Sequence, residues 1–208
     1  METLIAKVAV LLSMTMGLGT LGVYLGREIK SFGAFIGLAI AFVVGAIGVI
    51  FAASISPMAG ITALAVWALI SGLFTGPAIQ LYADKLGWQT VAGAFAGTSG
   101  VMAVCGSIGL FSGADFSSMG FYLGIALFGL IIVSVIGLFW RMSREMNIGM
   151  ALVGMVIFAG YFIFDFWRLG NSENTWAKAI ELTLNIYLDF LNFFLRLLEL
   201  LALLSNKS

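Results

Sequence analysis

Six polar residues recur at regular spacing near the C-terminal end of the chain, in a segment that is otherwise rich in Leu and Phe. They are Glu181, Asn185, Asp189, Asn192, Arg196 and Glu199. Their successive separations are 4, 4, 3, 4 and 3 residues, and such steps keep side chains on one face of an α-helix. We expect this polar face to turn toward a protein partner or a water-filled path, because apolar surroundings do not solvate charges.

A further acidic residue, Asp165, lies in the apolar stretch 161–169. If Asp165 meets Asp189, the two carboxyl groups cannot both ionise easily, and the pair tends to share a proton. When both are ionised, the pair attracts a cation, and carboxylate oxygens suit hard ions such as Ca²⁺. Asp165 and Asp189 are therefore candidates for a pH sensor, an ion pathway and a pair of Ca²⁺ ligands. The alternative is a hydrogen-bonded pair that only fixes the register of two helices.

Two arginines are candidate charge partners for these acids. Arg196 can pair with Glu199, three residues further along the same helix. Arg168 follows Asp165 by three residues and can pair with it, which competes with any contact between the two aspartates. The remaining supporting polar residues are Asn185 and Asn192.

The composition places these residues in a membrane. Of 208 residues, 62% are apolar and 10% are charged, and the mean hydropathy is +1.11, whereas soluble domains carry about 25% charged residues. Ten basic and ten acidic residues cancel, so we expect no nucleic-acid partner. The chain has no His and one Cys, which excludes an intrachain disulfide and a cysteine-based zinc site.

Charged or turn-rich breaks divide the chain into seven apolar runs of about 20 residues, the length that crosses a bilayer. The predicted spans are 8–25, 32–53, 61–82, 90–111, 121–140, 148–167 and 183–204. This pattern predicts an all-α membrane protein, a seven-transmembrane helix bundle that forms one integral membrane domain over 1–208. The first five spans contain no charged residue, so the charges at depth lie on the last two.

The start of the last span decides whether the two aspartates are level. Asp165 lies near the end of the span 148–167. If 175–182 stays outside the membrane as an interfacial turn, the last span begins at 183 and Asp189 is about six residues deep. On antiparallel neighbouring helices the two carboxyl groups are then at the same depth, and we expect them to meet.

Five segments carry a resemblance to a known family. They are KVAVLLSMTMG (7–17), ALISGLFTGPAI (68–79), AFAGTSGVMAVCGSIG (94–109), YFIFDFWRL (161–169) and NIYLDFLNFFLRLL (185–198). Together they resemble the Bax inhibitor-1 family of transmembrane Bax inhibitor motif proteins, in particular its small bacterial members. The most specific stretch is YLDFLN, at 187–192.

The resemblance implies a Bax inhibitor-1-like fold, in which six helices surround a central one, and a pH-sensitive Ca²⁺ leak across the membrane. It assigns the family's di-aspartyl sensor to Asp165 and Asp189. It also implies the bacterial inner membrane as the location, and a link to the membrane-embedded FtsH protease, which bacterial relatives modulate. Animal relatives suppress cell death.

One departure from the family pattern concerns a basic latch. Some members carry an arginine late in the second span that binds the aspartate of the sixth. The corresponding stretch here, 49–60, has no Lys or Arg, and the matching residue is Ser54. Either the latch is absent, or Arg168 or Arg196 replaces it.

The leading functional hypothesis is a proton-gated Ca²⁺ leak channel with Asp165 and Asp189 as sensor and cation site. The alternative is a membrane interaction protein that modulates a membrane protease or a stress response without transport of its own. We expect no enzymatic activity, because the sequence around the two aspartates lacks the glycine-containing motifs of aspartyl intramembrane proteases. We also expect no cofactor. The expected partners are membrane lipids, calcium ions and protons, with a membrane protease in the alternative.

Overall fold

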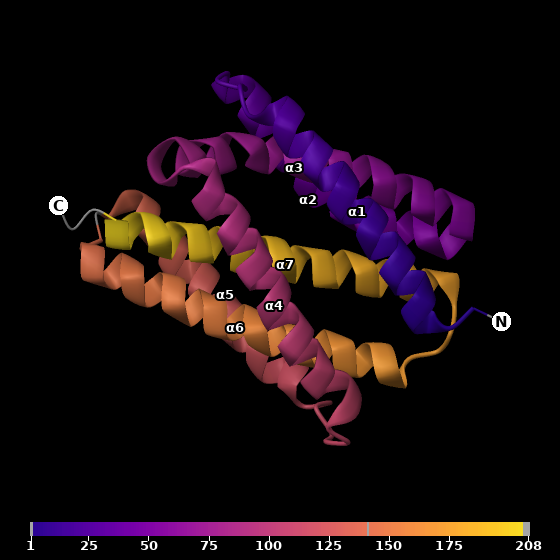
Figure 1. Cartoon of the computed structure of the whole chain (residues 1–208). Helices are drawn as coiled ribbons and strands as arrows, with labels where there is room; N and C mark the ends of the chain where they lie inside the picture. The colour runs from indigo at the N-terminus through magenta and orange to yellow at the C-terminus, as the bar shows by residue number, and fades with distance from the viewer. Residues whose placement is uncertain (1, 141, 206–208) are drawn as a thin grey trace. The chain divides into compact units, whose positions relative to one another are not determined.

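The structure is a computed structural model that describes residues 2–140 and 142–205, with the side chain of Leu138 left out. Helices make up this part of the chain, which contains no strand (Figure 1). They are α1 (Leu4–Gly26), α2 (Phe32–Ile55), α3 (Pro57–Leu86), α4 (Trp88–Phe111), α5 (Met119–Phe139), α6 (Arg144–Asn171) and α7 (Trp176–Ser205). The predicted all-α, seven-helix fold is confirmed, and most helices extend a few residues beyond the predicted spans.

Six helices of the described chain, α1 to α6, are long and apolar enough to cross a membrane. The protein is therefore an integral, multi-pass membrane protein. The seventh helix, α7, is 30 residues long but differs in composition, since charges recur along its length. Its crossing of the membrane stays a prediction.

The predicted interfacial turn at 175–182 is wrong, because α7 is already helical from Trp176. The hydroxyl oxygen of Thr175 accepts a hydrogen bond from the backbone N–H of Lys178 at 3.1 Å, the arrangement of a helix N-cap. Lys178 also pairs with Glu181 across one turn, at 2.9 Å. A cap and an i,i+3 ion pair are local interactions that favour helix over turn.

The chain divides into two units, which we describe separately. The first contains α1, α2, α3 as far as Leu81, and 171–187. The second contains the rest of α3 from Tyr82, then α4, α5, α6 as far as Gly170, and α7 from Leu188. The sequence prediction of one domain covered both units.

In the first unit, glycines let the backbones of α1 and α3 touch. A methyl group on Gly22 would collide with the backbone of Leu69 and Gly72, and one on Gly72 would collide with that of Gly19 and Val23. Small residues at such contacts are how helices pack closely in lipid, where no hydrophobic effect drives them together. Tyr187 joins this contact through a buried 2.7 Å hydrogen bond between its hydroxyl and that of Ser71.

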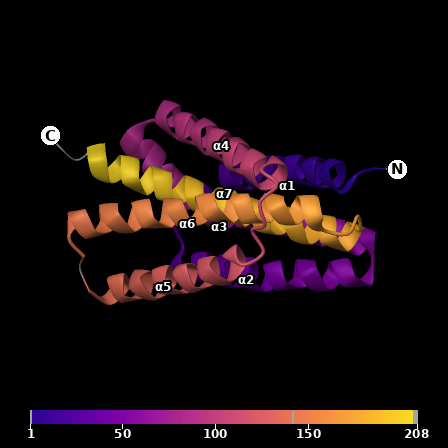
Figure 2. The ribbon, with the colours of Figure 1, turned by 90° about the horizontal axis from the view of Figure 1, so that it is seen from below.

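In the second unit, α6 is held by three neighbouring segments. On α4, a methyl group on Gly109 would collide with the backbone of Ile163 and lie 2.9 Å from Trp167 N. Helix α5 runs beside α6 (Figure 2), and a methyl group on Gly160 would lie 2.8 Å from the side chain of Leu123. The α7 segment adds the ring of Phe193, 5.9 Å from that of Phe162 between centroids.

The loop between α4 and α5 is stabilised by a glycine with positive φ and by a hydrogen bond to an aspartate side chain. Gly113 has a φ of 70°, a conformation that glycine adopts without strain. The backbone N–H of Ser117 donates to Oδ1 of Asp115 at 2.8 Å, and this hydrogen bond lowers the pKa of the exposed Asp115 carboxyl below its ordinary value. Asp115 is therefore ionised at neutral pH, outside the membrane-spanning helices.

The close contact of α1 with α3 at their glycines predicts how glycine substitutions change stability. Gly22→Ala should lower the melting temperature in detergent, because overpacking costs about 1–3 kcal/mol. Gly17→Ala is the matched control on the same helix, since a methyl group there has no atom within 4 Å; it should keep or raise the melting temperature. Equal melting temperatures of the two variants would show that the backbones of α1 and α3 are not in contact.

Candidate functional site

Asp165 on α6 and Asp189 on α7 form the core of the candidate site. Both belong to the second unit, and both are buried, with 2% and 7% of their surface exposed. Their side chains are in hydrogen-bonding contact with one another. The structure thus brings together the two acids that the depth argument paired, although α7 begins earlier than that argument assumed.

A contact between two carboxyl groups requires a proton. Carboxylate oxygens are acceptors only, so one of the two acids must carry a hydrogen to donate. Oδ2 of Asp189 is buried and receives no hydrogen bond from an N–H or hydroxyl donor of the described residues. A proton shared with Asp165, or a cation, would satisfy it.

Arg168 supplies a positive charge to the same site. Its Nη1 donates to Oδ1 of Asp165 at 3.1 Å, one turn along α6, and its guanidinium carbon lies 5.6 Å from the ring centroid of Phe164. The ion pair and the contact between the two acids coexist, so the competition expected from the sequence does not occur. Of the two arginines considered as replacements for a basic latch, Arg168 binds Asp165. The Ser54 hydroxyl, in the first unit, donates to the carbonyl of Phe51 at 2.7 Å.

Tyr161 is a neighbour of the pair that sequence reasoning missed. It precedes Asp165 by four residues on α6 and lies within electrostatic range of both carboxyl groups. Its spacing was the available signal, since positions i and i+4 share a helix face. Tyr161, Asp165 and Arg168 form a polar row on α6.

The other predicted residues on α7 make local contacts. Arg196 pairs with Glu199 at 2.8 Å, as its i,i+3 spacing predicted, and its Nη2 donates to the Ser134 hydroxyl at 3.3 Å. The amide nitrogen of Asn192 donates to the Leu188 carbonyl one turn earlier, at 2.8 Å. Asn185 is half-buried and belongs to the first unit. Of the six residues on the polar face of α7, Asp189 alone is buried, and the other five are half-buried.

The ligand set limits what the site can hold. Within 2–140 and 142–205, no group of three or more His, Cys, Asp or Glu side chains is placed to bind a metal ion. Ca²⁺ takes 6–8 oxygen ligands, and two carboxyl groups supply at most four. The pair therefore suits a passing, partly hydrated cation better than a permanently bound one.

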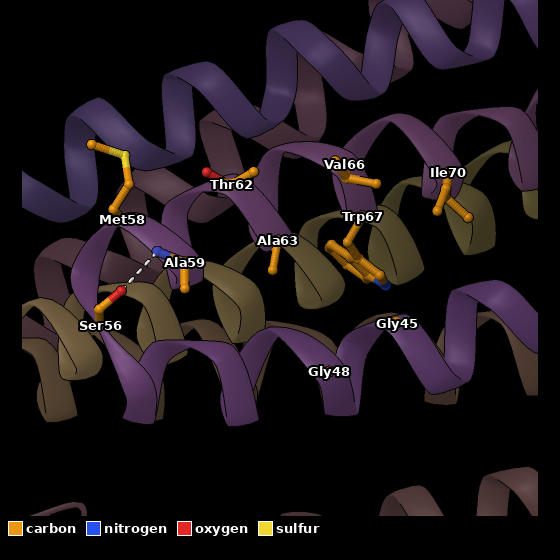
Figure 3. Close-up of a pocket in the computed structure, with 10 residues that line it drawn as sticks. All are labelled: Gly45, Gly48, Ser56, Met58, Ala59, Thr62, Ala63, Val66, Trp67 and Ile70. Atoms are coloured by element: carbon orange, nitrogen blue, oxygen red, sulfur yellow. Dashed lines mark hydrogen bonds between the residues drawn. The ribbon is translucent and has the colours of Figure 1, made fainter.

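A second feature is a groove between α2 and α3 in the first unit, and its lining is mostly apolar, unlike the charged Asp165–Asp189 pair (Figure 3). Its volume is about 720 Å³, and Trp67 and Ile70 lie on one wall opposite Gly45 and Gly48. The Ser56 hydroxyl at its end accepts the backbone N–H of Ala59 at 3.1 Å. Ser56 and Thr62 supply hydroxyl groups to this lining, but it has no acid or base to activate them, so the Asp165–Asp189 pair remains the candidate site.

Comparison with known proteins identifies the family. The model of the family described as "Inhibitor of apoptosis-promoting Bax1" matches residues 1–206. The chain belongs to the Bax inhibitor-1 family. The Bax inhibitor 1 of Schizosaccharomyces pombe is 30% identical over 138 residues, which are 66% of this chain and 50% of that protein.

Bacterial proteins are similar to the chain over comparable lengths. The inner membrane protein YbhL of Escherichia coli is 28% identical over 120 residues, 53% of this chain and 51% of its own. The uncharacterised protein YrjE of Lactococcus lactis is 37% identical over 101 residues, 46% of this chain and 43% of its own. The chain thus spans about half the length of the curated relatives it matches.

The ion pair between Arg168 and Asp165 should have a larger coupling energy than the more accessible pair of Lys178 and Glu181. In a double-mutant cycle of unfolding in mixed micelles, Arg168→Gln and Asp165→Asn should show a coupling energy of about 1–3 kcal/mol, because losing Arg168 leaves a buried acid without its cation. The matched i,i+3 pair Lys178 and Glu181 has side chains 30% and 31% exposed. For that pair we expect about 0.2–1 kcal/mol. Equal coupling energies would contradict an electrostatic role for burial at the site.

Proposed function

We propose that this Bax inhibitor-1 family protein is a pH-sensitive calcium leak channel, gated by protonation of Asp165 and Asp189. The observation that carries the proposal is the contact between two buried carboxyl groups on the neighbouring helices α6 and α7. Ionisable residues inside a membrane bundle are costly to retain and commonly mark ion or proton pathways. Membership of the Bax inhibitor-1 family supports the same assignment.

The gate works through the charge of the pair. With a shared proton, Asp165 and Asp189 are held together by a hydrogen bond, and Arg168 balances the remaining negative charge. Loss of that proton places two negative charges side by side, which repel each other and attract a cation. Calcium ions and protons thus compete for the same oxygens, and the leak depends on pH.

Few charged or titratable side chains surround Asp189, and this limits which residues can respond to pH in the gate. The charged or titratable side chains within electrostatic range of Asp189 among the described residues include Asp165, Arg168 and Tyr161. The chain contains no His, so the carboxyl groups are the groups through which this site can respond to pH near neutrality. Arg168 stays charged over this range.

The test is calcium flux into proteoliposomes loaded with a fluorescent calcium indicator, measured from pH 5.5 to 8. The Asp165→Asn and Asp189→Asn variants, singly and together, should abolish the pH dependence, because an amide does not titrate. Asp115→Asn, which removes the exposed acid of the α4–α5 loop, should leave the pH profile of the parent unchanged. A double variant that leaks like the parent at every pH would refute the proposal.

A parent protein whose flux equals that of empty liposomes would instead favour the interaction protein without transport. Co-purification of a membrane protease of the FtsH type from native bacterial membranes would then identify the alternative function.

A further inference from the structure

The second polar cluster of α7 lies two helical turns beyond Asp189, and the proposed gate does not use it. Arg196 and Glu199 have side chains 25% and 29% exposed. Among the apolar residues around them on α7, Phe193, Phe194, Leu198 and Ala202 are buried, whereas Leu195, Leu197 and Leu200 are half-buried, as the two charged residues are. The cluster therefore lies on the more accessible side of this half of the helix.

Water rather than lipid must meet this accessible side. A charged side chain that faces the hydrocarbon core costs about 2.5–3.5 kcal/mol on insertion scales. The surface of α6 that meets lipid has the opposite character, with Leu152, Val153 and Val156 each about half exposed or more. With α7 crossing the membrane as predicted, water that reaches Asn192, Arg196 and Glu199 would solvate both charges.

Three contacts fix the guanidinium of Arg196 in place. It donates to Glu199 on its own helix and to Ser134 on α5. Its stem lies against Gly154 of α6, where a methyl group would come within 3.2 Å of its Cγ, Cδ and Nε atoms. Tyr82 is in electrostatic range of Arg196 and Glu199. Glycine at position 154 thus makes room for an arginine that is anchored from three helices.

The order of charges along the helix gives the cluster a direction. Counted from the C-terminal end of α7, the residues on its polar face are Glu199, then Arg196, then Asn192, then Asp189. Arg196 is seven residues from Asp189, about 10 Å along the helix axis. A cation that approaches from this end first meets an acid that attracts it and then a base that repels it.

We propose that Arg196 is a positively charged barrier on the water-accessible side of α7, which limits how fast cations reach Asp189 from the C-terminal end of this helix. This inference rests on the proposed cation leak. Glu199 and Ser134 hold the barrier in place, and Asn192 lies between the barrier and the acid pair. Removal of one fixed charge at such a position changes the local concentration of a mobile ion by roughly tenfold.

The charge can be measured without any transport. In a Cys105→Ala background, the chain has no other cysteine, so Asn192→Cys introduces a single reporter thiol between Asp189 and Arg196. Protein in lipid nanodiscs is treated with methanethiosulfonate reagents of similar size, one cationic and one anionic. The ratio of the two modification rates, divided by the ratio for a small free thiol, reports the electrostatic potential at that position.

The reporter thiol should react with both reagents, and faster with the anionic one. Arg196→Gln should lower the anionic-to-cationic ratio roughly tenfold, and Glu199→Gln should raise it, because it leaves the guanidinium charge unbalanced. Lys178→Gln, which removes a positive charge near the other end of α7, should change the ratio less than twofold. The proposed charge barrier is refuted if the thiol reacts with neither reagent. It is also refuted if Arg196→Gln leaves the ratio of modification rates unchanged.

Calcium flux then separates this inference from the proposed function. Arg196→Gln should raise the flux roughly tenfold and keep the pH dependence of the parent, since Asp165 and Asp189 are intact. If the aspartate variants abolish the pH dependence and Arg196→Gln leaves the flux unchanged, the barrier is refuted and the calcium leak stands. If the thiol ratio responds to Arg196→Gln in a protein that does not leak, the positive charge on a water path is supported and the calcium leak is refuted.

Discussion

Two buried carboxyl groups in contact cannot both be charged without a large energetic cost, and this constraint organises the second unit. Asp165 and Asp189 lie among apolar helices where few groups can compensate them. A shared proton and the guanidinium of Arg168 are the compensation that the structure offers. Such a pair is sensitive to whatever changes its charge, whether a proton or a cation, because the surrounding medium screens so little.

The constraint applies only if α6 and α7 stay at the right depth relative to one another. Helix α6 is fixed by backbone contact with α4 at Gly109 and by side-chain contact with α5 at Gly160. At its N-terminal end, Arg144 donates two hydrogen bonds to the Leu203 carbonyl of α7, at 3.0 and 2.6 Å. Gly109 and Gly160 therefore have a positional role, since each lets α6 and a neighbouring helix approach closely.

Much of this arrangement could be predicted from the sequence, because it depends on local spacing. Steps of three and four residues placed Asp189 and Arg196 on one face of α7, and the same spacing predicted the pairs of Arg196 with Glu199 and Arg168 with Asp165. The apolar runs predicted all seven helices. The contact between the two aspartates was also predicted, from their equal depth on antiparallel helices, although the turn at 175–182 that this depth assumed is helical.

The parts that could not be predicted depend on capping and on three-dimensional packing. The segment 175–182 was expected to be a turn because its charges suggested an interfacial position, but the Thr175 cap and the pair of Lys178 with Glu181 make it helical. Tyr161 was overlooked because tyrosine is common in apolar helices, although its i,i+4 spacing from Asp165 placed its hydroxyl on the same helix face. The room that Gly154 leaves for Arg196 depends on the packing of α6 against α7, which no spacing within one helix specifies.

The most direct test of the account is an experimental structure in a lipid bilayer at an acidic and an alkaline pH, with Ca²⁺ present at both. The account predicts that the oxygens of Asp165 and Asp189 are in hydrogen-bonding contact at the acidic pH. At the alkaline pH they should be separated or bridged by a cation. The same direct contact at both pH values, with no cation between the acids, would contradict the claim that the charge of this pair gates the leak.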